Sequence, residues 1–279
     1  MEEHFHVGDT LNGFVFKEKP LQSALPLELL TQRKLESSML PPRLKFILSA
    51  TVFHALSATS DLDAATLDAQ FEDQEKTLSA VIAKMPRSVG LLSKRGDARL
   101  FQGNFAGAVA DYQEMIALDP SQDAPHWRLG IAYYFNGAFA AAAAQFEKYH
   151  AYDGRDRENG VWKFFCQARA EGVEAARKGL LVYTQFDREP FPSLYEMLAG
   201  KLSSKAFLEQ LQERGLGQER QVQFFAKYYA GLYEALFGEK AQGMAWLQEA
   251  VALFNGETAD RSGPGYMWHA ARLQWEALR

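Results

Sequence analysis

Between residues 88 and 154 the chain repeats matching side chains at a spacing of 34 residues. A period of this length indicates supersecondary units that stack on one another, because no single unit can bury its apolar face alone. Small residues suit places where two helices cross closely, and an aromatic side chain fills the space between them. The chain is therefore predicted to be an array of helical hairpins. The matched pairs are Gly96 and Gly130, Ala108 and Ala142, Tyr112 and Phe146, and Pro86 and Pro120.

This pattern resembles the tetratricopeptide (TPR) signature, which places Gly, Ala, an aromatic residue and Pro in this order within a unit of about 34 residues. The resemblance implies an all-α fold. We predict a TPR-type right-handed helical solenoid of about four helical hairpins with a C-terminal capping helix. The two clear repeats are residues 88–119 and 123–152.

Outside these two repeats the period weakens. A helix with an apolar face follows residue 60 and resembles the second half of a degenerate repeat. A shortened third repeat ends near residue 180, and the prolines at 190 and 192 prohibit one continuous helix there. The remaining predicted elements are short helices at 193–199 and 203–214, a fourth repeat at 218–254, a loop at 255–265 and a final helix at 266–279.

The N-terminal part, residues 1–58, is predicted to be an extension of the repeat domain, which spans 59–279. Residues 1–20 weakly suggest a β-hairpin around Asn12 and Gly13. Residues 39–58 have two positive charges, an apolar run of about 13 residues and small residues after it, which is the layout of a signal peptide. The run is too short for a stable membrane span, which needs ~20 residues. The alternatives are an exported, periplasmic protein that starts at Met39, or a cytoplasmic protein with an ordinary buried helix here.

Composition and motifs exclude several classes of function. The net charge is −5, with 30 basic and 35 acidic residues and no basic run, so we expect no nucleic-acid partner. Cys166 is the only cysteine and lies in an apolar stretch, which indicates a buried thiol and excludes an internal disulfide. His4 and His6 have no third ligand in view. We find no phosphate loop, nucleophile motif or metal-ligand spacing, and we predict no catalytic residue, no metal, no cofactor and no enzyme activity.

The first helix of each repeat should line the concave groove of the solenoid, and its inward positions are aromatic or apolar instead of basic. This composition disfavours a clamp for a C-terminal carboxylate and suits a peptide that buries hydrophobic side chains. An alternative is that the chain's own helices between residues 186 and 215 cover these side chains, since stable monomers rarely expose large apolar patches. The predicted partner-binding residues are Asp97, Phe101, Trp127, Ile131, Tyr134, Phe135, Phe225 and Tyr228.

Three stretches resemble the NlpI-like TPR lipoproteins of bacterial envelopes: His126–Gly137, Glu189–Ser203 and Phe225–Gly238. The middle stretch is the most telling because it lies outside the repeat pattern. The resemblance implies a non-catalytic envelope adaptor, often dimeric, that brings proteases or peptidoglycan hydrolases together. This chain departs from that family because no cysteine follows residues 46–58 to carry a lipid anchor.

The predicted function is a non-catalytic scaffold that binds a protein or peptide segment in the groove. Two alternatives stay open. One is a small-molecule or enzymatic site near the bend from Asp187 to Tyr195, which would need polar groups converging on a closed pocket. The other is a purely structural homodimer built through the N-terminal helices, which sedimentation of a chain lacking residues 1–87 would test.

Overall fold

A computed structural model describes residues 66–279 of the chain, and every regular element in this range is helical. The predicted hairpin at 1–20, the signal-like segment 39–58, the histidine pair near the N-terminus and the boundary at residues 58 and 59 lie outside the described residues. Between residues 66 and 279, no helix is both long and apolar enough to cross a membrane.

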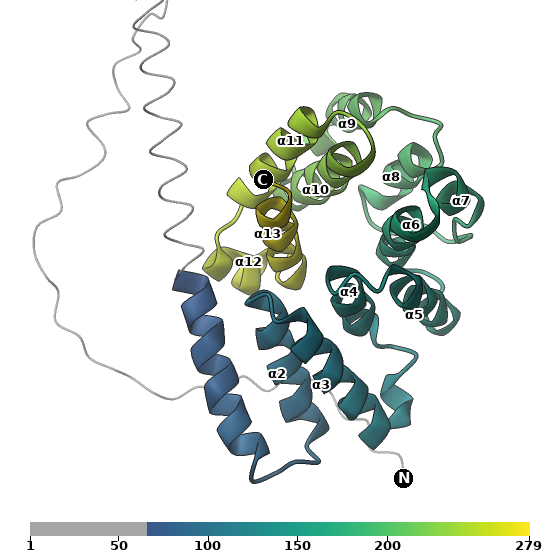
Figure 1. The fold of residues 1–279 in the computed structure, drawn as a ribbon. Coiled ribbons are helices and arrows are strands. Elements are labelled where there is room, and N and C mark those ends of the chain that lie inside the picture. The colour runs from purple at the N-terminus through teal and green to yellow at the C-terminus, as the bar shows by residue number, and fades with distance from the viewer. Residues whose placement is uncertain (1–65) are drawn as a thin grey trace, which may run out of the picture. The chain divides into compact units, whose positions relative to one another are not determined.

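The two clear repeats form as predicted. The first is α2 (Val89–Phe101) and α3 (Phe105–Leu118), and the second is α4 (Trp127–Phe135) and α5 (Phe139–Tyr152). Each pair is antiparallel and closely packed, and Figure 1 shows them in succession after the helical residues 66–82. The 34-residue period therefore identified the hairpins and their boundaries to within a few residues.

Both hairpins turn at a glycine in the left-handed region. The φ angles are 85° at Gly103 and 77° at Gly137, which residues with a Cβ rarely adopt. After the first turn, the side chain of Asn104 accepts a hydrogen bond from the backbone N–H of Gly107 at 3.1 Å and thereby caps α3. These local preferences end one helix and start the next.

Close helix crossings explain the periodic glycines. A Cβ on Gly96 would lie 2.5 Å from Cε1 of Tyr112, and one on Gly130 would lie 2.7 Å from Cζ of Phe146. In both repeats the aromatic ring thus occupies the space that the missing side chain leaves. The prediction that small and aromatic residues pair across the hairpin is confirmed in both.

The middle of the chain contains shorter helices. The short second helix predicted for the third repeat is present. The first short helix after the bend begins at Phe191, two residues earlier than predicted, because Pro192 lies in its first turn, where no backbone N–H is needed. These elements are α6 (Arg157–Glu171), α7 (Val173–Lys178), α8 (Phe191–Leu198) and α9 (Ser204–Glu213).

The C-terminal part contains the fourth predicted hairpin and the final helix. These are α10 (Arg220–Phe237), α11 (Lys240–Ala252) and α13 (Tyr266–Leu278). The predicted loop at 255–265 is wrong in part, since it contains the helix α12 (Gly256–Ser262). A reciprocal pair of hydrogen bonds between Asn255 and Thr258 caps α12 and explains why a sequence with loop-forming residues starts a helix here.

The helices of residues 66–279 follow one another round an arc, so α13 comes to lie beside α2 (Figure 1). A continuous buried apolar cluster extends from α2 through α13. The described part of the chain is thus an all-α TPR-type helical solenoid. Its last helix contacts its first repeat as well as its neighbour α11.

Candidate functional site

We use the name concave face for Asp97 and Phe101 on α2 and Trp127 and Arg128 on α4. These four side chains contact either one another or α13, and they come from the inward helices of the two clear repeats. Asp97 lies on the first helix of one repeat and Arg128 on the first helix of the next. Their separation of 31 positions is close to the 34-residue period, as expected for equivalent helices of adjacent repeats. The concave face is therefore a product of stacking two repeats.

An ion pair at the centre of the concave face joins the two repeats. One Asp97 oxygen accepts a hydrogen bond from Tyr112 Oη and the other accepts one from Arg128 Nη1, both at 2.6 Å. Burial raises the pKa of Asp97, and the positive charge of Arg128 together with the hydrogen bonds from Tyr112 and Arg128 offsets only part of that rise. The Asp97 side chain is 25% exposed and the Arg128 side chain is 30% exposed, so the pair is partly open to solvent.

Aromatic rings of α13 cover the rest of the concave face. The Tyr266 ring lies edge-on to Phe101 and Trp127, with ring centroids 4.7 Å and 4.8 Å apart. His269 stacks on Phe101 at 4.3 Å with 26° between the ring planes. The final helix therefore packs against the concave face through two of its aromatic side chains.

A buried arginine adds a polar contact to the same interface. Arg272 donates from Nη2 to the backbone carbonyl of Phe101 at 2.5 Å and from Nη1 to Asp68 at 3.2 Å. It also pairs with Glu276 on its own helix at 3.1 Å. The arginine thus links α13 to the end of α2 and to the helical residues 66–82.

His126 stabilises the first turn of α4, the helix that carries two residues of the concave face. Its Nδ1 accepts a hydrogen bond from the backbone N–H of Leu129 at 3.0 Å and so caps α4, the helix that carries Trp127 and Arg128. Burial, together with the nearby positive charge of Arg128, lowers the pKa of His126 to about 4. The imidazole is therefore neutral near pH 7, as an acceptor in a helix cap must be.

Five of the eight predicted partner-binding residues are buried by the chain itself, which favours the alternative that the chain covers these side chains. Phe101 lies under α13. Ile131 is inaccessible, and Tyr134 packs edge-on to Trp162 with centroids 5.4 Å apart. Of the eight predicted residues, only Asp97 and Trp127 combine partial exposure with a position on the concave face. As partner-binding residues the eight stay a prediction.

The three remaining predicted residues do not reach the concave face as defined here. Phe135 stacks on Phe105 of α3, with centroids 5.1 Å apart. Phe225 packs against Phe191 of α8 at 5.3 Å, and Tyr228 is fully buried beside Phe224. The alternative in which residues 186–215 cover the aromatic positions thus describes Phe225, whereas α13 covers the first repeat.

Sequence reasoning missed Arg128 and the three α13 residues Tyr266, His269 and Arg272. A signal existed for Arg128, because an acidic and a basic residue on equivalent helices of adjacent repeats can pair. A weaker signal existed for α13, whose three residues are spaced three apart and so share one side of a helix. Only the three-dimensional structure shows that this side of α13 contacts Phe101.

The charged side chains of the bend from Asp187 to Tyr195 are paired, whereas Glu189 Oε2 and Tyr195 Oη are buried without a hydrogen-bond partner among the described residues. Asp187 accepts from the backbone N–H of Arg157 at 2.9 Å, and Arg188 pairs with Glu158 at 2.5 Å. Arg214 bonds both Glu189 and Ser193. The charges of the bend therefore tie α6, α8 and α9 together.

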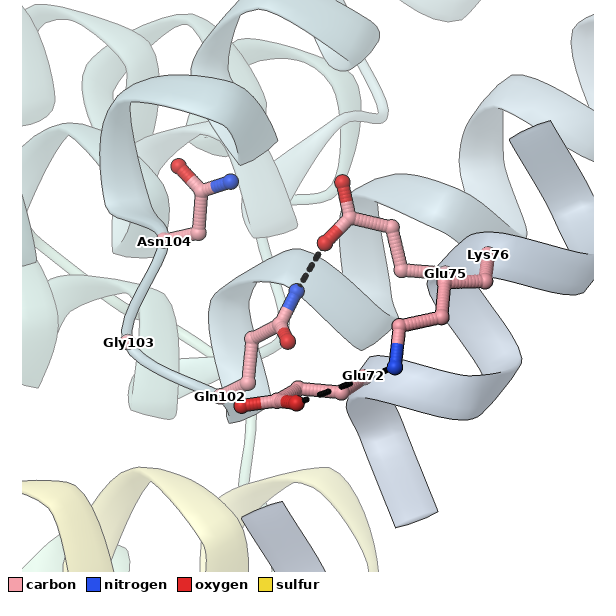
Figure 2. A pocket seen from close by; sticks show the side chains of 6 residues that line it. All are labelled: Glu72, Glu75, Lys76, Gln102, Gly103 and Asn104. Atoms are coloured by element: carbon pink, nitrogen blue, oxygen red, sulfur yellow. Dashed lines mark hydrogen bonds and ion pairs between the residues drawn. The ribbon is translucent and has the colours of Figure 1, made fainter. Parts of the chain in front are cut away.

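A polar pocket of about 450 Å³ lies between the helical residues 66–82 and the turn after α2. Figure 2 shows its lining, in which the Glu75 carboxylate accepts from Gln102 while Lys76 faces Glu72. The second oxygen of Glu75 accepts from Arg99 Nε at 2.7 Å. Burial raises the pKa of Glu75, but the bonds from Arg99 and Gln102 outweigh it and lower the pKa overall. The hydrogen bonds of Glu75 with Arg99 and Gln102 therefore join the helical residues 66–82 to α2 beside this pocket.

Residues 96–137 match the family model described as the TPR repeat. This range starts at the glycine that meets Tyr112 and ends at the second turn glycine, so it spans α3, α4 and the concave face. This segment of the chain is thus a tetratricopeptide-repeat sequence. Repeats of this family typically mediate contacts between proteins and are typically non-catalytic. Within residues 66–279, no group of three or more His, Cys, Asp or Glu side chains is arranged to hold a metal ion.

Proposed function

We propose that the protein is a non-catalytic scaffold that binds a segment of a partner protein at the concave face. The observation that carries this proposal is the part-exposed Asp97–Arg128 pair beside Trp127, on the inward helices of two adjacent TPR repeats. An aromatic ring flanked by a fixed acid and a fixed base offers both an apolar anchor and charge selection. This arrangement supports binding of a peptide segment.

The partner segment is proposed to approach beside the N-terminal end of α13, where Tyr266 meets Trp127. Export to a bacterial envelope, the setting that the NlpI-like resemblance implies, is part of the same proposal and rests on residues 39–58. A small-molecule site at the bend has less support, because its charged side chains Asp187, Arg188 and Glu189 already form ion pairs within the chain. Assembly of two chains through the N-terminal helices is compatible with a scaffold.

We expect Trp127→Ala to lower partner recovery at least about tenfold, the equivalent of about 1.4 kcal/mol of binding energy. The substitution removes the apolar anchor of the concave face. Recovery is measured by chemical cross-linking and affinity capture with the full chain in extract of the native host, followed by quantitative mass spectrometry. Tyr152→Ala is the matched control, since Tyr152 is 65% exposed and lies at the end of α5.

A second variant tests charge selection. Asp97→Arg combined with Arg128→Asp keeps an ion pair within the chain and reverses the charges that a partner meets. We expect the same partner to be lost from the cross-linked set. Recovery equal to that of the Tyr152→Ala chain for both variants would rule out the concave face as the binding site.

A further inference from the structure

One side of α13 contacts the concave face as a bound helix would. Tyr266, His269 and Arg272 recur every three residues and so lie along one side of the helix. The first two pack on Phe101, and the third donates to the carbonyl of Phe101. Two aromatic contacts and one arginine thus define what this surface accepts.

The arginine position is selected by charge. Phe101 is the last residue of α2, and the terminal carbonyls of a helix carry partial negative charge. Asp68 adds a full negative charge 3.2 Å from Arg272 Nη1. A helix that docks here therefore needs a cation at this point, and the planar guanidinium can reach both acceptors at once.

The interface leaves polar atoms of α13 unsatisfied. His269, Arg272 and Gln274 are all at least nine-tenths buried. His269 Nδ1 and Arg272 Nε have no hydrogen-bond partner among the described residues. Buried polar atoms without partners weaken an interface. A helix that keeps the aromatic and arginine contacts without these unpaired atoms would bind the concave face more tightly.

Another residue of α13, next to His269, is anchored to α11. Trp268 is buried and donates from Nε1 to the carbonyl of Val251 on α11 at 3.0 Å. This contact does not involve the concave face. The final helix can therefore stay attached to α11 while its contacts with Phe101 and Trp127 are replaced.

We propose that α13 is an intramolecular competitor at the concave face, and that it yields to an amphipathic helix of a partner protein. That helix presents an aromatic residue and, six positions later, an arginine, as Tyr266 and Arg272 do. The proposal rests on the scaffold function and adds its regulation: the partner binds only when it outcompetes α13. Competition within one chain is strong, because tethering keeps the effective concentration of α13 high.

The test measures binding of a fluorescein-labelled peptide, residues 264–279 of this chain, to the full chain by fluorescence anisotropy. Tyr266→Ala with Arg272→Ala removes the internal anchors and leaves the concave face intact. We expect this variant to bind the peptide at least tenfold more tightly than the unmodified chain does. Adding Trp127→Ala to the same variant should abolish the gain.

Arg279→Ala is the matched control, because Arg279 is an arginine of the same segment that lies over Trp275 instead of Phe101. We expect it to leave peptide affinity unchanged. Equal affinity of the Tyr266→Ala/Arg272→Ala chain and this control, with near-ultraviolet circular dichroism showing that both are folded, would overturn the proposal.

Hydrogen exchange on the unmodified chain provides a test that needs no variant. Excess unlabelled peptide should speed amide exchange in residues 266–272 and leave α10 unchanged; no change in residues 266–272 at saturating peptide contradicts the proposal. The partner-capture experiment separates the two proposals. If partner capture depends on Trp127 but the peptide does not compete with α13, the scaffold function is supported and the competition by α13 is ruled out. Peptide competition without such capture would show that α13 can be displaced from the concave face, but it would remove the scaffold function and with it the regulatory role of α13.

Discussion

Replacing Gly243 by alanine is expected to lower the free energy of unfolding by about 3 kcal/mol, at the upper end of the usual cost of overpacking. A Cβ at this position would lie 2.2 Å from the backbone nitrogen of Ala235 and 2.6 Å from the carbonyl oxygen of Gly231. Both obstacles are backbone atoms, so the clash is relieved only by moving α10 and α11 apart. Urea denaturation of the full chain, followed by circular dichroism at 222 nm, measures the change.

Gly90→Ala is the matched control for this prediction. Gly90 is also helical and has no heavy atom within 4 Å of an added Cβ. Alanine should therefore raise stability by up to about 1 kcal/mol, because it restricts the unfolded chain without creating a clash. Equal denaturation midpoints for the Gly243→Ala chain and the unmodified chain would show that the α10–α11 crossing is not tight.

The second large effect concerns pH. Glu158 on α6 is buried, and burial raises its pKa from 4.5 to about 7 although Arg188 and Tyr229 stabilise the charged form. Tyr229 Oη and Arg188 Nη2 each lie 2.5 Å from a Glu158 oxygen. The carboxylates of Asp156 and Asp187 also face this group and contribute to the rise. The folded protein therefore holds the Glu158 proton more tightly than the unfolded chain does.

The stability that this proton contributes is complete below pH 4.5 and is lost as the pH rises through about 7. The loss is on the order of 3 kcal/mol over this window, at about 1.4 kcal/mol per pKa unit. We expect Glu158→Gln to remove most of this slope. The measurement is the free energy of unfolding from urea titrations at half-unit steps between pH 4.5 and 8.

Glu75→Gln is the control for the pH prediction, because the pKa of Glu75 is lowered whereas that of Glu158 is raised. The lowered pKa of Glu75 means that its contribution is present above pH 4.5 and is lost only as the pH falls further. Glu75→Gln should therefore leave the slope between pH 4.5 and 7 unchanged. A Glu158→Gln chain with the same slope as the Glu75→Gln chain would contradict the assignment.

The repeat period predicted most of the fold because each matched position has a local role. Gly96 must lack a Cβ where Tyr112 crosses, Gly103 must adopt a positive φ, and Asn104 must cap the next helix. None of these requirements depends on distant parts of the chain. The helices of the clear repeats could therefore be predicted from the sequence. The helix α12 was not predicted, because its capping residues Asn255 and Thr258 lie among residues typical of loops.

The candidate site was predicted less well because burial at the concave face is not a local property. Phe101 and Trp127 were predicted on inward helices, but helical spacing cannot say what lies opposite them. Tyr266 and Arg272 come from the end of the chain, about 140 to 170 positions away, and reach the concave face because the solenoid curves. Phe225 is covered by Phe191 for the same reason, on a different stretch of the arc.

The sequence by itself determined an all-α array of TPR-type hairpins, since periodicity is a property of neighbouring residues. The tertiary structure alone decided that α13 covers the concave face and that Asp97 and Arg128 remain partly exposed there. The physical reason is that the curvature of a stacked array sums small rotations at every helix crossing. The accumulated curvature places α13 against α2, and this curvature cannot be predicted from any short stretch of sequence.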